Sequence, residues 1–268
     1  MLRLIVLGSG SSGNAAVLCT GKTRILIDAG LGIRTLRARL AEAQVDPSSL
    51  SGILLTHEHS DHTAGLTGLC KRHSLPIYCN ALTAHSLQSS SFLKNYAAWK
   101  IFETGAEFSL GGLRIQSFST PHDAADPVGF TIHDTRHCLG ILTDIGYAPG
   151  HILHHLEEVG SLYIEANHDE HLLQEDTKRP WSVKQRILSR HGHLSNKAAA
   201  EIVCHLAKKS LRNVIAAHLS RDCNRPDIVR KTILSELQRE NLDPVQIVCT
   251  SQERILIVRL SHENTLNK

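Results

Sequence analysis

The chain has 268 residues, of which 41% are hydrophobic and 21% are charged, a composition that supports a packed core and excludes a disordered segment. Its formal net charge of +3 is too small to indicate a nucleic-acid partner, and no apolar run reaches the roughly 18 residues of a membrane-spanning helix, which excludes a membrane-spanning protein. The seven cysteines are dispersed and form no Cys-x-x-Cys pair, which argues against a disulfide framework and against a thiolate zinc site. Unpaired cysteines of this kind favour the reducing cytoplasm as the location.

Short strands are the main elements predicted in the first two thirds of the chain. The opening run 2–7 is apolar and partly β-branched, as in a buried strand, and further short runs follow it between turn residues. Helical patterns are expected at 33–43 and 63–72. The predicted strands cover residues 2–7, 15–18, 24–28, 52–56, 77–79, 113–119, 129–132, 138–143 and 162–165.

Helices alternate with strands in the last third. Ser195 is expected to cap a helix over 196–210 with one apolar face, and Pro226 is expected to open a second helix that runs to about residue 240. Strands are predicted at 214–217, 247–250 and 255–260. The pattern indicates a single domain, 1–268, of packed sheets with helices outside.

The segment 8–13 has the Gly-x-Gly-x-x-Gly spacing of a dinucleotide-binding loop. That motif requires a helix directly after it, whose first turn binds the pyrophosphate. Only about seven residues separate Gly13 from the next turn at Gly21-Lys22, fewer than the ~10–12 that a crossover between parallel strands needs. We therefore expect a Gly/Ser turn between two antiparallel strands.

The densest group of potential metal ligands is the segment 56–62, Thr-His-Glu-His-Ser-Asp-His. Because alternate residues of an extended segment point to the same side, His57 and His59 can chelate one ion. Asp61 and His62 follow where the strand gives way to a loop, so they can face a second position. Imidazole and carboxylate ligands without thiolate suit Zn²⁺, Mn²⁺ or Fe²⁺.

This histidine motif resembles that of the metallo-β-lactamase superfamily of dinuclear hydrolases, as does Asp28-Ala29-Gly30 after a strand. The resemblance implies an α/β fold, the four-layer αββα sandwich of two mixed sheets packed face to face with helices outside. It also implies two divalent metal ions per chain, with Zn²⁺ favoured. The implied first site is His57, His59 and His122, and the implied second site is Asp61, His62 and His218, with Asp144 bridging the two.

Other segments favour one branch of the superfamily. The redox di-iron branch has Glu in place of His59, and the secreted antibiotic-cleaving enzymes carry a signal peptide. Gly-His-Leu-Ser at 192–195 and His-Leu-Ser at 218–220 resemble instead the phosphodiesterase branch that includes tRNase Z. That likeness implies that His193 protonates the leaving oxygen, that Asp61 orients the nucleophile, and that Ser220 orients a phosphate oxygen or the His218 ring; Ser195 caps the helix.

A narrower set of motifs resembles the YycJ (WalJ) family, whose members are bacterial and cytoplasmic. The set comprises segments 9–14, 165–169 and 191–196, and His218-Leu219-Ser220 followed by Asn224. The resemblance implies 5′-to-3′ exonuclease action on DNA, and we expect Glu165 and His168 to fix loops or support ligands. The sequence at 221–223 departs from the family pattern, but it affects a loop and no expected ligand.

A basic segment precedes the proposed acid. Residues 177–200 contain no Asp or Glu, and Lys184, Arg186 and Arg190 are among their six basic side chains. Such clusters bind phosphate backbones, and the indole of Trp181 could stack on a base. The alternative is a solvated helical face with a buried Trp. The uneven charge favours a polyanionic substrate, and the family resemblance implies DNA ahead of RNA as that substrate.

The sequence leaves several functions open beside a two-metal DNA exonuclease. A small-molecule or cyclic phosphodiesterase and an RNA-processing nuclease would use the same residues. A glyoxalase II-like thioesterase shares all seven ligands, although its small substrate does not need the basic segment. A metal-stabilised regulatory protein without turnover would have no need for His193. Metal identity, strand polarity and oligomeric state do not follow from the sequence.

Overall fold

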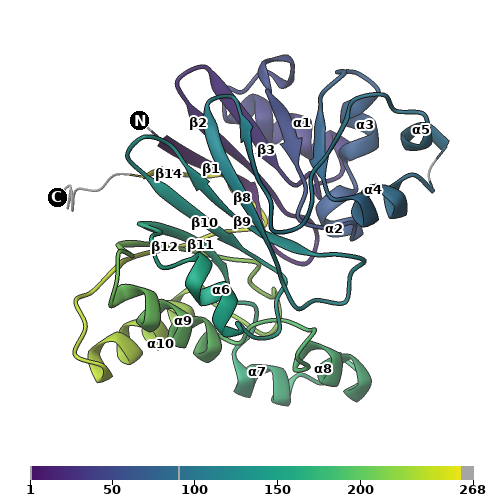
Figure 1. Ribbon diagram of the computed structural model, residues 1–268. Helices are drawn as coiled ribbons and strands as arrows, with labels where there is room; N and C mark the ends of the chain where they lie inside the picture. The colour runs from purple at the N-terminus through teal and green to yellow at the C-terminus, as the bar shows by residue number, and fades with distance from the viewer. Residues whose placement is uncertain (1, 90, 261–268) are drawn as a thin grey trace.

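The computed structural model describes residues 2–89 and 91–260, so residues 1, 90 and 261–268 of the expected domain lie outside the described chain. Two sheets of seven strands each lie face to face (Figure 1). The first sheet has the order β14-β1-β2-β3-β4-β5-β6, and the second has the order β13-β12-β11-β10-β9-β8-β7.

The strands of the first sheet are β1 (Leu2–Gly8), β2 (Ala15–Thr20), β3 (Thr23–Ile27), β4 (Gly52–Leu54), β5 (Ile77–Cys79), β6 (Trp99–Ile101) and β14 (Leu256–Leu260). Those of the second are β7 (Glu107–Leu110), β8 (Leu113–Ser119), β9 (Val128–His133), β10 (Cys138–Leu142), β11 (Ser161–Glu165), β12 (Asn213–Ala217) and β13 (Gln246–Cys249). Each sheet is mixed: antiparallel pairs meet parallel pairs at β3 and at β10.

Helices form the two outer layers. The helices are α1 (Ile33–Glu42), α2 (Ser60–Thr63), α3 (Leu66–Cys70), α4 (Ala81–Leu87), α5 (Ser91–Lys94), α6 (Gly150–His155), α7 (Glu170–Glu175), α8 (Trp181–Ile187), α9 (Asn196–Ala207) and α10 (Pro226–Arg239), with a 3-10 turn at Pro47–Ser49. Figure 1 shows α1, α3 and α4 outside the first sheet and α6, α9 and α10 outside the second.

Three apolar clusters hold these layers together. One lies between the two sheets and includes Leu4 and Phe130. The second packs α1 and α3 on the first sheet through residues such as Leu36, and the third packs α9 and α10 on the second through residues such as Val203 and Ile233. Burial of these faces is the main stabilising contribution. The expected four-layer αββα sandwich is confirmed.

The structure also differs from the expected elements. The single helix predicted at 63–72 is two short helices, α2 and α3, separated near Gly65. A Cβ on Gly65 would lie 2.4 Å from the carbonyl oxygen of Leu31, so glycine permits the close backbone approach that breaks the helix. The edge strands β6 and β7 and the helices α4–α8 were not predicted, because they are too short to show a clear period.

The Gly-x-Gly-x-x-Gly segment is a turn, as predicted. It joins β1 to β2, which pair antiparallel, and no helix follows. Gly13 has a φ of +143° and a Cβ there would lie 2.5 Å from the carbonyl oxygen of Gly30, so only glycine fits. None of the described helices is both long and apolar enough to cross a bilayer.

Candidate metal centre

The site lies where several strands end at one edge of the two sheets. β3 and β4 run parallel, and so do β10, β11 and β12, so that the ends of neighbouring strands deliver their next residues to the same edge. One polar residue follows each of three strands within two positions: Asp28 after β3, Asp144 after β10 and His218 after β12. All three have a left-handed backbone, with φ of 55°, 52° and 53° respectively. Non-glycine residues rarely adopt this conformation, and it concentrates at functional sites.

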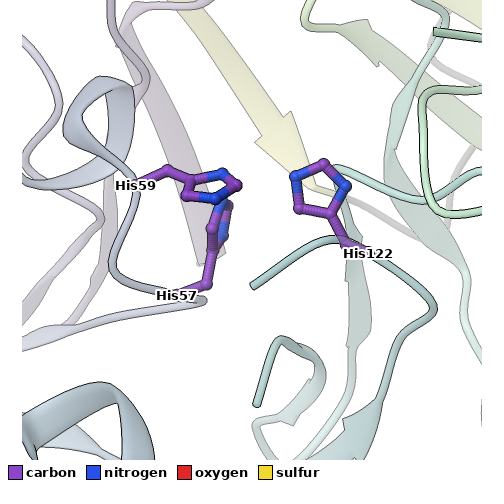
Figure 2. Close-up of side chains that lie close together, drawn as sticks. All are labelled: His57, His59 and His122. Atoms are coloured by element: carbon purple, nitrogen blue, oxygen red, sulfur yellow. The ribbon is translucent and has the colours of Figure 1, made fainter. Parts of the chain in front are cut away.

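Three histidines converge at the first candidate position. His57 and His59 come from the loop between β4 and α2, and His122 comes from the loop after β8. Their ring centroids lie 4.6–5.2 Å apart, and one nitrogen of each lies within 4.8 Å of the others. Figure 2 shows the three rings directed toward one another from the two loops. The spacing suits a single ion held by three imidazoles.

The second group surrounds the Asp144 carboxylate. Its Oδ2 lies 3.0 Å from Nε2 of His62 and its Oδ1 lies 3.1 Å from Nδ1 of His218. Oδ2 of Asp61 lies 3.5 Å from Nε2 of His62 and 3.6 Å from Nε2 of His218. Asp144 Oδ1 is also 3.9 Å from Nε2 of His122. Asp144 therefore lies between the two groups, and the structure brings all seven expected ligands together.

Asp28 orients His62. Its Oδ2 lies 2.7 Å from Nδ1 of His62, while its Oδ1 accepts the backbone N–H of Thr56 at 2.9 Å. Both side chains are buried. A carboxylate that accepts the Nδ1 proton fixes the tautomer of the ring and leaves Nε2 free to bind a metal. This arrangement supports a metal role for His62.

The buried polar atoms of the site fit a cation. His57 Nε2 is buried without a hydrogen bond within the described chain. Asp144 Oδ2 and His218 Nδ1 are also buried, and although each lies 3.0–3.1 Å from a nitrogen or oxygen of the site, neither makes a hydrogen bond of suitable geometry to a described residue. Unpaired buried polar atoms are costly, and a divalent ion would satisfy a mixed imidazole and carboxylate set of this kind. The three candidate ligand groups in the described chain contain no cysteine.

Electrostatics also favour positive charge here. Burial alone would raise the pKa of Asp144, but the imidazoles of His218 and His62 hold it well below its usual range. Burial would lower the pKa of His218, yet Asp144 and Glu165 raise it to about 10. Burial lowers the pKa of His57 well below its ordinary value, so His57 is a neutral ring suited to coordination. The ionised carboxylates thus require positive charge beside them, which either protonated imidazoles or bound metal ions can provide.

Glu165 and His193 form a pair beside Asp144. Oε1 of Glu165 lies 2.7 Å from Nδ1 of His193, and Oε2 accepts the backbone N–H of Ile145 and Leu194. Burial would lower the pKa of His193, but the Glu165 carboxylate raises it. Glu165 is fully buried, whereas 24% of the His193 side chain is exposed. The pair resembles the base-orienting arrangement of other hydrolases.

Four other expected residues have structural contacts. Oγ of Ser195 caps α9 by accepting the N–H of Ala198, and it donates to Glu170. Ser220 Oγ accepts the N–H of Cys223, and Asn224 pairs reciprocally with Asn196. His168 contributes through its backbone carbonyl, which accepts the N–H of Asn196 at 2.8 Å, while its buried ring makes no hydrogen bond within the described chain. Their described contacts fix loops around the site; none is to a ligand atom.

The basic segment is more heavily neutralised than the sequence suggests. Lys178 and Arg179 pair with Asp222. Lys184 is buried and donates to the Gln174 carbonyl at 2.8 Å, which differs from the expected contact with substrate. Arg190 lies over the ring of Tyr147.

Trp181 is exposed by 62%, in contrast to the buried Trp of the alternative interpretation. Helical geometry places it on roughly the opposite side of α8 from Val183 and Ile187, which line the site. Trp181 is therefore exposed outside the cleft, and its position argues against stacking on a base within the site.

A cleft of about 200 Å³ opens over the candidate ligands. Several residues that line it were not singled out from the sequence, notably Ser11, Asp123 and Ile187. Ser11 belongs to the Gly/Ser turn after β1, and Asp123 directly follows His122. Proximity to the motifs in sequence could have indicated both, whereas Ile187 depends on the phase of α8.

Comparison with known proteins agrees with this geometry. Residues 23–218 match the family model described as "Beta-lactamase superfamily domain". The chain is 33% identical to exodeoxyribonuclease YycJ of Bacillus anthracis, covering 89% of this chain and 90% of that one. It is 34% identical to exodeoxyribonuclease WalJ of Streptococcus pneumoniae (strain D39), covering 88% of both chains.

Solved structures show the same fold at low identity. The metallo-β-lactamase fold protein YhfI of Bacillus subtilis has a TM-score of 0.73 and 17% identity, covering 96% of this chain and 99% of that one. The short form of human tRNase Z has a TM-score of 0.68 and 16% identity, covering 97% of this chain and 99% of that one. The chain therefore belongs to the metallo-β-lactamase superfamily, and within it to the YycJ (WalJ) family of hydrolases.

Proposed function

We propose that the protein is a two-metal phosphodiesterase that degrades DNA from its 5′ end. The observation that carries the proposal is the convergence of seven metal-ligand side chains beside the Glu165–His193 pair. The two relatives above are named exodeoxyribonucleases, which supports DNA as the substrate. Seven unpaired cysteines suit the cytoplasmic location expected of such an enzyme.

Two divalent ions, with Zn²⁺ favoured over Mn²⁺ or Fe²⁺, would be held by the seven residues. His57, His59 and His122 would hold the first, and Asp61, His62 and His218 would hold the second, with Asp144 shared. A bound metal pair supplies Lewis-acid stabilisation of the phosphoryl oxygens and activates water.

His193 is suited to protonate the leaving group. Its Nδ1 is engaged by the Glu165 carboxylate, so the ring is held in one orientation while its exposed part lines the cleft. When water adds to phosphorus and the bond to the sugar oxygen breaks, that oxygen requires a proton. His193 would donate it, and Asp61 at the same cleft would orient the attacking water.

End-labelled nucleic acids test the proposal directly. The purified protein is loaded with Zn²⁺, Mn²⁺ or Fe²⁺ and incubated with single- and double-stranded DNA and RNA labelled at the 5′ or the 3′ end. Release of mononucleotides from the 5′ end of DNA is expected. If the protein prefers RNA or cyclic nucleotides, that class replaces DNA as the substrate. If it hydrolyses none of the phosphodiesters, the proposal is overturned.

A further inference from the structure

The Gly/Ser turn at residues 9–14 is held rigidly over the cleft. Oδ1 of Asn14 accepts the hydroxyl of Ser9 and the N–H of Gly10, each at 3.0 Å. From the other side, Gln252 accepts the N–H of Ser12 at 3.1 Å and donates to the carbonyl of Gly13 at 2.9 Å. At its two ends the turn also supports the candidate metal centre, since Asn14 Nδ2 lies 3.4 Å from Oδ2 of Asp61 and Ser9 Oγ accepts the backbone N–H of His218 at 2.8 Å.

Ser11 is the residue of this turn that faces the site. It lines the cleft together with His59, Asp61 and His193, and it is exposed. Within the described chain neither its hydroxyl nor its backbone N–H makes a hydrogen bond. The neighbouring N–H groups are all used: those of Gly10 and Gly13 bond within the turn, and that of Ser12 bonds to Gln252. Ser11 thus lines the cleft and has two adjacent donors, its hydroxyl and its backbone N–H, that are unused within the described chain.

Arg186 of α8 lines the same cleft, and it is the one Lys or Arg among the described residues that do so. Its Nε and Nη2 both lie against Oδ2 of Asp123, at 2.7 and 2.6 Å, and 68% of the side chain is exposed. A guanidinium has five N–H donors in a rigid plane, so one carboxylate oxygen leaves several of them unused. Asp123 therefore orients Arg186 without consuming its binding capacity.

We propose that Ser11 and Arg186 bind the phosphate group of the substrate, with Asp123 as a positioning residue for Arg186. The inference rests on the proposed function and adds residues to it. A phosphodiester carries an anionic charge on two non-bridging oxygens, and charged or convergent N–H and O–H donors are the groups that bind such oxygens best. The metal ions would offset the charge of the carboxylates that hold them, and Ser11 and Arg186 would supply N–H and O–H donors beside them on the wall of the same cleft.

Inorganic phosphate is the probe, measured by calorimetric titration into the metal-loaded protein and by competitive inhibition of bis(p-nitrophenyl) phosphate hydrolysis. Ser11→Ala is expected to weaken phosphate binding and to raise KM by about 10-fold, as loss of a hydrogen bond to a charged group does. Ser12→Ala is the matched control, because its side chain does not line the cleft and its N–H remains bonded to Gln252. It is expected to change neither value.

Arg186→Gln is expected to weaken phosphate binding by about 10- to 100-fold, and Arg186→Lys is expected to restore part of the loss because charge returns without the planar fork. Metal content and unfolding midpoint of each variant are measured alongside. If the folded, metal-loaded Ser11→Ala and Arg186→Gln variants bind phosphate as tightly as the wild type, this inference is overturned. The proposed function still stands in that case, provided that the wild type hydrolyses phosphodiesters. Failure of the wild type to hydrolyse phosphodiesters would overturn the proposed function, and the calorimetric titration would still decide the inference.

Discussion

Oε1 of the fully buried Glu165 lies 2.7 Å from Nδ1 of the partly exposed His193. Burial alone would raise the pKa of Glu165, but His193 and other contacts lower it to about 2, so the carboxylate stays ionised. Its second oxygen is fixed by the backbone N–H groups of Ile145 and Leu194. Glu165 can therefore hold the His193 ring without competing for the proton that the leaving group needs.

His193→Ala is expected to lower turnover on DNA by ~10²–10⁴-fold while both metal ions remain bound, because a general acid is lost and no ligand is. The loss on bis(p-nitrophenyl) phosphate should be much smaller, since p-nitrophenolate leaves without a proton. Steady-state kinetics on both substrates and metal analysis check this. Loss of metal together with equal damage to both substrates would show instead that His193 is a ligand.

Asp28→Asn is expected to weaken metal binding at the second position by ~10–100-fold, since the carboxylate that fixes the His62 tautomer is lost. Asn tolerates the left-handed backbone at this position, so the fold should be kept. Titration against a competing chelator measures the affinity. Asp46→Asn, at an exposed cap that does not line the cleft, is the control and should bind metal as the wild type does.

Asp144→Ala is expected to lose both ions, because one carboxylate lies between the two groups of ligands. Elemental analysis of loaded protein should give two ions per wild-type chain and fewer than one for the variant. Two ions bound to a folded Asp144→Ala chain would contradict a shared role for this carboxylate.

Much of the candidate ligand set could be proposed from the sequence, because the first four members form one dense motif and the family resemblance implies the other three, each after a predicted strand. His57, His59, Asp61 and His62 are close in the chain, and a strand before each later ligand is visible as an apolar run. The polarity of the strands then brings their ends to one edge. Strand runs in the first part and strand–helix alternation at the end predict packed sheets with outer helices, while the family resemblance implies the two mixed sheets that the structure has.

The contacts that the sequence could not provide join residues far apart in the chain. Whether Lys184 faces solvent or the protein depends on the phase of α8, and a seven-residue helix flanked by polar residues shows no decisive period. The pairing of Arg186 with Asp123 likewise depends on how α8 packs against the loop after β8. Charge counted along the chain therefore overstated the positive surface near the site.

Lys184 and Arg190 are expected to behave differently, although both lie in the basic segment. Lys184→Met should lower the free energy of unfolding by about 1–3 kcal/mol, since it leaves the Gln174 carbonyl without the ammonium that ties α8 to α7. Because that ammonium is engaged inside the protein, the salt dependence of binding to long DNA should be unchanged. Urea unfolding and fluorescence anisotropy of labelled DNA at several salt concentrations measure the two effects.

Arg190→Ala should give the opposite result. The side chain is exposed, and its described contact is with the ring of Tyr147, so its loss should change the unfolding free energy little. If the DNA backbone passes this residue, the slope of log binding constant against log salt should fall by about one, because one phosphate contact is removed. An unchanged slope in Arg190→Ala together with a reduced slope in Lys184→Met would show that the buried lysine reaches DNA and that the exposed arginine does not.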